Sequence, residues 1–315
     1  MEVRTVVAIV ENITDLVGST PLVRLNRLAP QGVTVLVKLE SRNPAFSVKD
    51  RIAKGIVEAA EASGELQPGG TIVEATSGNT GVALAMIGAA RGYKVVLAMP
   101  KSMSIERRAL ARAYGAELLL TDPAQGMSGA VAAIDAYAEK HPGVVKARQF
   151  ANPANLATHR ATTAEEIWAD TNGEVDVFVA GVGTGGTLSG VGQVLRERKP
   201  QAQVVAVEPT DSPLLSTGKA GPHKIQGIGA NFVPEVLDRE VYTEVLQVTN
   251  EDAFATSRAL AAQEGILVGI SAGANVWAAL QVAARPESQG KTIVTVLPDT
   301  GERYVSTPLW SELVD

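Results

Sequence analysis

The stretch Val175-Asp176-Val177-Phe178-Val179-Ala180-Gly181-Val182-Gly183-Thr184-Gly185-Gly186-Thr187 decides the fold class. Its first half is a short run of apolar and β-branched residues, which favours a buried strand. The glycines that follow favour a tight turn, and the amphipathic run from Leu188 to Arg198 favours a helix. A buried strand that passes through a glycine-rich turn into a helix is typical of parallel α/β sheets. We therefore expect an α/β protein with a ligand site at the carboxyl end of this strand.

The glycine-rich turn indicates an anion site, with two candidate ligands. Residues Gly181–Gly186 have the pattern G-x-G-x-x-G, and Glu208 ends the next expected strand, which is the arrangement of a dinucleotide site. However, Thr184 and Thr187 add hydroxyl donors to the backbone amides at the expected helix start. A terminal phosphate has enough exposed oxygens to use all of these donors. The loop therefore predicts phosphate binding and favours a monoester over a bridging pyrophosphate.

The rest of the chain repeats the alternation of strand and helix in two series that meet near Asn152-Pro153. The expected strands are 33–39, 71–75, 94–99, 117–120, 175–180, 204–207 and 292–297, and the expected helices are 50–63, 80–91, 104–114, 129–140, 163–170, 188–198, 252–264 and 272–284. This alternation predicts two doubly wound α/β domains with mostly parallel sheets and an active site in the cleft between them. The irregular stretch 210–241 is expected to form a mobile flap over the cleft.

Lys49 is the candidate nucleophile, in the stretch Asn43-Pro44-Ala45-Phe46-Ser47-Val48-Lys49-Asp50-Arg51. Turn-forming residues precede it and an amphipathic run follows, so we expect Lys49 in the first turn of a helix, where a cation is least favoured. A site that disfavours the ammonium favours the neutral amine, which Schiff-base chemistry needs. The alternative is a solvated surface lysine, which is the usual state of a single lysine.

Two further strand-to-helix loops carry polar side chains. In Glu74-Ala75-Thr76-Ser77-Gly78-Asn79-Thr80-Gly81, hydroxyl and amide groups crowd one helix start, which favours a second anion such as a substrate carboxylate. Capping by Ser77 or Thr80 explains one of these polar residues but not all of them. In Val268-Gly269-Ile270-Ser271-Ala272-Gly273-Ala274, Ser271 taken alone is best explained as a helix cap.

The composition excludes several classes of function. The 315 residues suffice for two domains, and a net charge of −6 argues against a nucleic-acid surface. No apolar run is long enough for a membrane span or has the form of a secretory signal. The chain contains no cysteine, and His141, His159 and His223 lack metal-ligand spacing, so we expect these histidines to be structural or surface residues. We expect no metal, nucleic-acid or membrane binding, and the lack of cysteine fits a cytoplasmic protein.

Together the motifs resemble those of fold-type II enzymes that depend on pyridoxal 5'-phosphate (PLP). The patterns Asn-Pro-x-x-Ser-Val-Lys-Asp-Arg, Thr-Ser-Gly-Asn-Thr-Gly, Gly-Thr-Gly-Gly-Thr and Gly-Ile-Ser-Ala-Gly occur in the order seen in those enzymes. More narrowly, the chain resembles the cysteine synthase/cystathionine β-synthase family and its O-acetylserine sulfhydrylases, from about Ile13 to about Thr307. Further matches lie in 18–25, 103–108, 149–155 and 225–232. Lys101 departs from the family, which commonly has an acidic residue there.

The resemblance implies a role for each motif. Lys49 forms the Schiff base with PLP and acts as base and acid at the substrate Cα. The other cofactor contacts are Asn79 to the 3-oxygen, Ser271 to the pyridine nitrogen, and a phosphate cup of Gly183, Thr184, Gly185, Gly186 and Thr187. The substrate is bound by Thr76, Ser77, Gly78, Thr80, Gln149 and Gly227.

The resemblance also implies a division of the chain and a reaction. One domain is 42–152, with a mobile part around 92–135, and the other is 13–41 with 153–315. The reaction is a β-replacement that makes L-cysteine from O-acetyl-L-serine and sulfide, releases acetate and passes through an α-aminoacrylate. A neutral hydroxyl at Ser271 suits this chemistry better than transamination, because it does not keep the pyridine nitrogen protonated.

Alternatives and partners remain open on the sequence. O-phosphoserine sulfhydrylase or cystathionine β-synthase-type replacement uses much of the same machinery, although the segment Thr210–Leu215 has no arginine for a substrate phosphate. An NAD-dependent dehydrogenase, from a different class, explains Gly181–Gly186 but assigns no role to Lys49. The resemblance further implies a homodimer whose cleft can receive the C-terminal tail of serine acetyltransferase.

Overall fold

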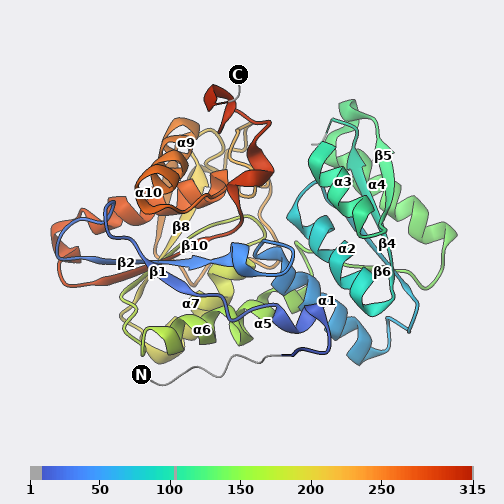
Figure 1. Ribbon diagram of the computed structural model, residues 1–315, viewed down its shortest axis with the longest axis horizontal. Coiled ribbons are helices and arrows are strands. Elements are labelled where there is room, and N and C mark those ends of the chain that lie inside the picture. The colour runs from blue at the N-terminus through green and yellow to red at the C-terminus, as the bar shows by residue number, and fades with distance from the viewer. Residues whose placement is uncertain (1–8, 103–104, 314–315) are drawn as a thin grey trace.

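Two separate β-sheets organise the computed structural model, which describes residues 9–102 and 105–313. They form the cores of the two lobes in Figure 1. The larger sheet has the strand order β1-β2-β10-β7-β8-β9, and the smaller sheet has the order β5-β4-β3-β6. Among the described strands, neighbours run parallel except for β1 and β2, which are antiparallel. The expected α/β class with mostly parallel sheets is confirmed.

The regular elements follow the apolar periodicity of the sequence closely. The strands are β1 (Leu22–Arg24), β2 (Thr34–Leu39), β3 (Thr71–Ala75), β4 (Lys94–Pro100), β5 (Glu117–Thr121), β6 (Val145–Lys146), β7 (Val177–Gly181), β8 (Gln203–Pro209), β9 (Glu244–Val248) and β10 (Thr292–Leu297). The helices are α1 (Lys49–Ser63), α2 (Asn79–Arg91), α3 (Ile105–Ala113), α4 (Gly126–Lys140), α5 (Pro153–Ala161), α6 (Thr163–Asp170), α7 (Gly186–Arg198), α8 (Leu214–Thr217), α9 (Asn250–Ala259) and α10 (Ile270–Ala283).

Helices cover the larger sheet on both faces (Figure 1). Along β7, Val177 and Val179 pack into the core on the α9–α10 side, whereas Phe178 and Ala180 pack with Leu188 of α7 on the opposite side. Because both sets are apolar, β7 reads as a continuous hydrophobic run, as expected for a strand buried on two faces. The loop after β7 is thus attached to a rigid, fully packed strand.

The smaller sheet is built in the same way. On one face Val73 and Val96 pack against Ile134 of α4. On the other face Ile72 and Leu97 belong to a core shared with α1 and α2. The last residues of β3 and β7, Ala75 and Gly181, both line the space between the lobes.

Five elements were not expected from the sequence, because none of them has a strong periodic pattern of apolar residues. The strands β1 and β6 are too short to show alternation, and β9 forms an edge of the larger sheet. The helix α5 begins with Asn152 as its N-cap and Pro153 at its first position, a helix-start signal that the sequence analysis used only as a boundary. The irregular stretch 210–241 contains the short helix α8. The expected helix start at Ser104 lies outside the described residues.

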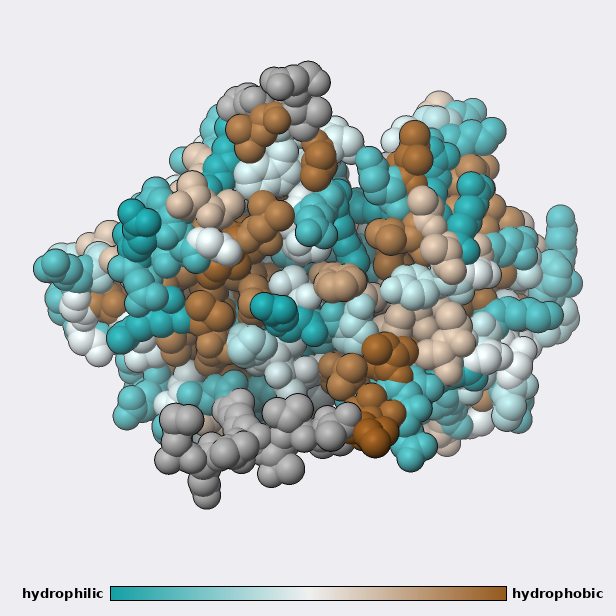
Figure 2. All heavy atoms as spheres, viewed as in Figure 1, coloured by the Kyte–Doolittle hydropathy of each residue, from teal (hydrophilic) through white to brown (hydrophobic). Residues whose placement is uncertain are grey.

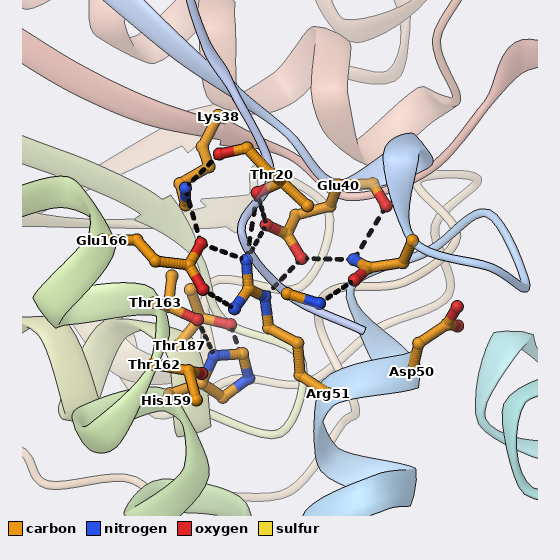
Figure 3. Close-up of polar contacts among 12 residues, drawn as sticks. Thr20, Lys38, Glu40, Asp50, Arg51, His159, Thr162, Thr163, Glu166 and Thr187 are labelled. Atoms are coloured by element: carbon orange, nitrogen blue, oxygen red, sulfur yellow. Dashed lines mark hydrogen bonds and ion pairs between the residues drawn. The ribbon is translucent and has the colours of Figure 1, made fainter. Parts of the chain in front are cut away.

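An ion-pair network joins α1 of the smaller lobe to β2 and α6 of the larger lobe (Figure 3). Arg51 of α1 is 1% exposed and contacts Glu40, which follows β2, at 2.7 Å and Glu166 of α6 at 2.7 Å. Lys38 of β2 contacts Glu166 at 2.8 Å. Burial opposes ionisation of Glu166, but hydrogen bonds and charge from Arg51, together with Lys38, lower its pKa to about 2. The network fixes the start of α1, and hence Lys49, relative to the larger sheet.

Candidate active site

A cavity of about 1150 Å³ lies between the lobes, where the surface is hollowed (Figure 2). Its wall includes the starts of α1, α2, α7 and α10, which come from both lobes. Nearly all of the residues singled out in the sequence line it: Lys49, Thr76, Ser77, Gly78, Asn79, Thr80, Gln149, Gly183, Thr184, Gly185, Thr187, Gly227 and Ser271. Gly186 begins α7 directly behind this wall. The position agrees with the rule that ligands of open α/β sheets bind at the carboxyl ends of strands.

Lys49 is the first residue of α1, as the sequence predicted. The turn before it is held by Asp50, whose carboxylate accepts a hydrogen bond from the Ala45 amide at 2.5 Å, and by a 2.8 Å bond from the Val48 amide to the Pro298 carbonyl. Burial lowers the pKa of Lys49, while the charges of Asp299 and Glu40 partly oppose the shift. The sequence suggested that the helix start would disfavour the charged form of Lys49, but burial is the main cause of the lowered pKa. The result is an amine that is deprotonated more readily than a surface lysine.

The loop between β7 and α7 is a cradle that accommodates glycine only. A Cβ on Gly183 would lie 2.3 Å from the Gly227 carbonyl oxygen, and one on Gly186 would lie 1.9 Å from Asn155 Oδ1. Gly185 has φ +85°, and its Cβ would lie 2.7 Å from Leu237. The first amides of α7 have no intrahelical partner, and the helix dipole adds positive charge at this point. The donor set and the dipole fit a phosphate group.

The loop between β3 and α2 is polar and open. Within it, the Gly78 amide donates to Thr76 Oγ1 at 3.2 Å, and Thr80 Oγ1 donates to Gln149 Oε1 at 2.6 Å. A Cβ on Gly78 would meet no heavy atom of the described chain within 4 Å. The space and the hydroxyl groups fit a small carboxylate at the start of α2.

Glu74, at the end of β3, supports this second loop from behind. Its carboxylate accepts hydrogen bonds from the Arg148 amide at 2.8 Å and the Gln149 amide at 3.4 Å. These bonds hold a turn in which Arg148 has φ 52°, an uncommon value for a residue other than glycine. Burial raises the pKa of Glu74 to about 7, although the backbone bonds lower it in part. The sequence analysis missed this residue because a lone glutamate in a strand gives no signal of its tertiary partner.

Asn79 belongs to a polar cluster that the sequence analysis also missed. Its Nδ2 donates to Asp299 Oδ2 at 2.6 Å, and its Oδ1 accepts from Arg303 Nη1 at 2.6 Å. Tyr304 donates to the same Asp299 oxygen at 2.6 Å. Asp299 Oδ1 is buried and has no hydrogen-bond partner within the described ranges. One amide proton of Asn79 is left for a ligand, which fits the predicted bond to a cofactor oxygen.

Ser271 lies in the first turn of α10 and is 3% exposed. It faces Gly227, since a Cβ on that glycine would lie 3.3 Å from Ser271 Oγ. The helix start itself is capped by Gly269 without a side-chain bond. Ser271 therefore has a place in the cavity wall, where the sequence of this loop alone indicated a cap.

The dinucleotide interpretation of Gly181–Gly186 is not supported by the position of Glu208. Its carboxylate accepts hydrogen bonds from the amides of Leu215 at 2.6 Å and Ser216 at 3.1 Å. Glu208 is 2% exposed, so it holds the start of α8 and does not reach toward a ribose. Within residues 9–102 and 105–313, no cluster of His, Asp or Glu has the form of a metal site, and no helix is long and apolar enough to cross a membrane.

Comparison with known proteins identifies the class. The chain matches the model of the pyridoxal-phosphate dependent enzyme family over residues 13–299, and it belongs to that family. It is 51% identical over 304 residues to the cysteine synthase of Staphylococcus aureus (strain Mu50 / ATCC 700699), covering 96% of this chain and 97% of that protein. Its fold is similar to that of O-ureido-L-serine synthase, with TM-score 0.94, 52% identity and coverage of 98% and 96% of the two chains. It is also similar to the cysteine synthase of Entamoeba histolytica, with TM-score 0.94, 44% identity and coverage of 98% and 94%.

The cavity fits the family's cofactor on its own chemistry. The glycine cradle at α7 suits the phosphate of PLP, and the buried amine of Lys49 suits a Schiff base. The hydroxyl of Ser271 lies on the same wall. PLP is therefore the cofactor of this chain, and the resemblance drawn from the sequence motifs is confirmed.

Proposed function

We propose that this chain catalyses a PLP-dependent β-replacement that makes L-cysteine from O-acetyl-L-serine and sulfide and releases acetate. The observation that carries the proposal is the arrangement of the buried Lys49 amine between two anion-binding helix starts, one closed around glycines and one open and rich in hydroxyl groups. The first suits the phosphate of a resident cofactor, and the second suits the carboxylate of a substrate that enters and leaves. The 51% identity with a cysteine synthase supports the assignment.

Each group of residues has a proposed task. Bound PLP supplies an electron sink that makes the proton at the substrate Cα acidic. Lys49 holds the cofactor, removes the Cα proton, and returns it after sulfide has replaced acetate at Cβ. The cofactor is held by Asn79, Gly183, Thr184, Gly185, Gly186, Thr187 and Ser271. The substrate is held by Thr76, Ser77, Gly78, Thr80, Gln149 and Gly227.

We further propose that substrate binding moves part of the smaller lobe, residues 92–135 of a domain 42–152, toward the domain formed by 13–41 and 153–315. The open space around Gly78, in the loop between β3 and α2, supports this movement. It leaves room for the smaller lobe to close on a carboxylate bound at that loop. Closure would exclude water from the reacting Cβ. Limited proteolysis or hydrogen exchange, with and without a non-reacting amino acid, would detect protection of 92–135.

The reaction is tested by steady-state kinetics with sulfide and one of three amino acids. O-acetylserine should give the highest kcat/KM, ahead of O-phosphoserine and serine. The purified protein should be yellow, and borohydride reduction followed by peptide mapping should label Lys49. A label on another lysine, or turnover with NAD and no bound PLP, would contradict the proposal. Because one similar structure is an O-ureido-L-serine synthase, the nucleophile should also be varied at saturating O-acetylserine.

Assembly and location are proposals that rest on the family. We propose a cytoplasmic homodimer whose cleft receives the C-terminal tail of a serine acetyltransferase. Light scattering would give the mass of the assembly. A peptide with that tail sequence should compete with O-acetylserine, and a peptide that activates or has no effect would contradict this partner. Cell fractionation would locate the protein.

A further inference from the structure

Asn155 is a buried side chain to which the catalytic proposal assigns no task. It lies on α5, is 0% exposed, and sits between the phosphate loop and the Gln149 turn. Its Nδ2 donates to the Gln149 carbonyl at 2.8 Å and to Thr184 Oγ1 at 3.0 Å. Its Oδ1 is buried and has no hydrogen-bond partner in the described part of the chain. A single amide therefore contacts groups from both sides of the cavity.

The orientation of this amide is determined by its partners. The Gln149 carbonyl can only accept a hydrogen bond, so the amide must turn its nitrogen toward it. The oxygen then faces Gly186, where a Cβ would lie 1.9 Å away and where glycine leaves only a C–H group. Because the second amide proton is directed at Thr184, the threonine oxygen must act as acceptor.

Thr184 is left with one way to use its own proton. Its oxygen accepts from Asn155 and, at 3.4 Å, from the Gly186 amide, so both lone pairs are engaged. The hydroxyl proton is then available to donate, and Thr184 lines the cavity. A phosphate accepts hydrogen bonds and has no proton to give when fully ionised.

We propose that Asn155 is a positioning residue that makes the Thr184 hydroxyl an obligatory donor to the cofactor phosphate. The inference rests on the proposed PLP site. Asn155→Asp replaces the donating nitrogen with a carboxylate oxygen of nearly the same shape. The carboxylate accepts a hydrogen bond from the Thr184 hydroxyl, which turns that hydroxyl away from the phosphate, and it adds a negative charge beside the phosphate.

The test measures the rate at which the loaded protein releases PLP. Release is monitored as the loss of cofactor absorbance after a PLP scavenger is added. Asn155→Asp should release PLP at least about tenfold faster than the parent at about pH 8. The reason is that the variant loses a charge-assisted hydrogen bond from Thr184 to the phosphate and gains a negative charge beside it. The difference should shrink at lower pH, because protonation of the carboxylate removes the negative charge added beside the phosphate. Other groups near the cavity also titrate or carry charge, namely Glu74, His159 and Lys49. The release rate of the variant is therefore divided by that of the parent at each pH. A ratio that stays constant with pH, or stays near one, would overturn the proposal.

Two further variants separate hydrogen bonding from packing. Asn152→Ala removes the N-cap of the same helix, whose Oδ1 accepts from the Ala154 amide at 3.0 Å, and should leave the release rate within about twofold of the parent. If Asn155→Asp does not fold, Asn155→Ala is compared in the parent and in Thr184→Val. The acceleration should be smaller in Thr184→Val, and an equal acceleration in both would mean that Asn155 acts through packing alone.

Failure of the cofactor proposal gives a different result. A parent protein that takes up no PLP contradicts the proposed function itself. In that case the same variants are compared with inorganic phosphate, by phosphorus NMR line broadening. Weaker phosphate binding by Asn155→Asp than by the parent would support the role of Asn155, and equal binding would overturn it.

Discussion

The two helix starts that face Lys49 are built in opposite ways. At α7, added Cβ atoms on Gly183 and Gly186 would lie within 2.3 Å of their neighbours, so the loop has one conformation and little room for another. At α2, a Cβ on Gly78 would meet no described heavy atom within 4 Å. The closed loop suits a group that stays bound through every turnover, whereas the open loop suits a group that arrives and departs. In the proposed function, rigidity is thus placed at the loop assigned to the cofactor, and free space at the loop assigned to the substrate.

The largest expected effect removes the residue that both helix starts face. Lys49→Ala should lower kcat by roughly a thousandfold or more, because the Schiff base and the proton transfer at Cα are both lost. Lys54→Ala is the matched control, since Lys54 lies on the same helix and pairs only loosely with Glu58 at 3.9 Å. Steady-state turnover with O-acetylserine and sulfide measures both variants. Comparable losses at the two positions would mean that damage to α1, not chemistry, explains the result.

A pair of glycine substitutions tests the comparison directly. Gly183→Ala places a methyl group against the Gly227 carbonyl and should weaken PLP retention by roughly a hundredfold, because backbone must shift. Gly78→Ala has open space and a backbone that other residues adopt, with φ −120°, so PLP retention should be unchanged. Its effect should be limited to the KM for O-acetylserine. The contrast between closed and open loops fails if Gly78→Ala loses PLP as readily as Gly183→Ala.

Hydroxyl deletions sharpen the same contrast at a smaller scale. Thr187→Val keeps the shape of the side chain but removes the hydroxyl, and it should weaken PLP binding by about 1–3 kcal/mol. Ser77→Ala in the open loop should raise the KM for O-acetylserine and leave PLP content unchanged. Cofactor content after dialysis and the KM are measured on both variants. An unchanged KM in Ser77→Ala would remove that residue from the substrate site.

The smallest effect concerns the pH dependence of stability, to which Glu74 behind the open loop contributes. Glu74 has a pKa of about 7 in the fold against 4.5 as a free side chain, so the fold favours its protonated form. The contribution of Glu74 to the free energy of unfolding should therefore fall, by up to about 1.4 kcal/mol per pH unit, as the pH rises from about 4.5 to about 7. Glu74→Gln should flatten this decline. Urea unfolding at about pH 5 and about pH 7 measures it, and an unchanged slope would contradict the assignment.

Asp50, His159 and Glu166 must be considered when that slope is measured. Burial lowers the pKa of His159 well below its ordinary value of 6.5, so its contribution to the free energy of unfolding rises with pH in this window and opposes the decline from Glu74. Burial raises the pKa of Asp50 to about 7, which gives the same sign as Glu74, so part of the decline should persist in Glu74→Gln. Glu166, with a pKa of about 2, contributes stability that is lost only as the pH falls below about 4.5. Its contribution therefore does not enter the window of the experiment.

The sequence predicted the parts of the site whose cause is local. The apolar strands determine where the loops occur, and the glycines of Gly183–Gly186 form the tight turn at the start of α7 that the sequence predicted. Lys49 was placed at its helix start from the turn residues before it. These inferences succeed because the relevant contacts lie within a few residues of one another.

The residues that the sequence analysis missed depend on contacts between distant segments. Asn155 contacts a loop 29 positions away, and Glu74 holds a turn 74 positions away. His159 was assigned a structural or surface role, and the structure shows it buried, with its Nε2 3.2 Å from Thr187 Oγ1 (Figure 3). A side chain whose partner is chosen by tertiary packing gives no periodic or local signal, so no pattern in a single sequence identifies it.

The ion-pair network between the two lobes has a consequence for how related sequences can differ. Lys38 and Arg51 balance Glu40 and Glu166, and the guanidinium of Arg51 bonds to both carboxylates. Replacing one member leaves an uncompensated charge in a dry interior, which costs more than the whole set contributes. We therefore expect these positions to change together or not at all during divergence. Substitutions among related sequences should instead be concentrated at the mouth of the cavity. There they can change substrate specificity without disturbing the ion-pair network that positions Lys49.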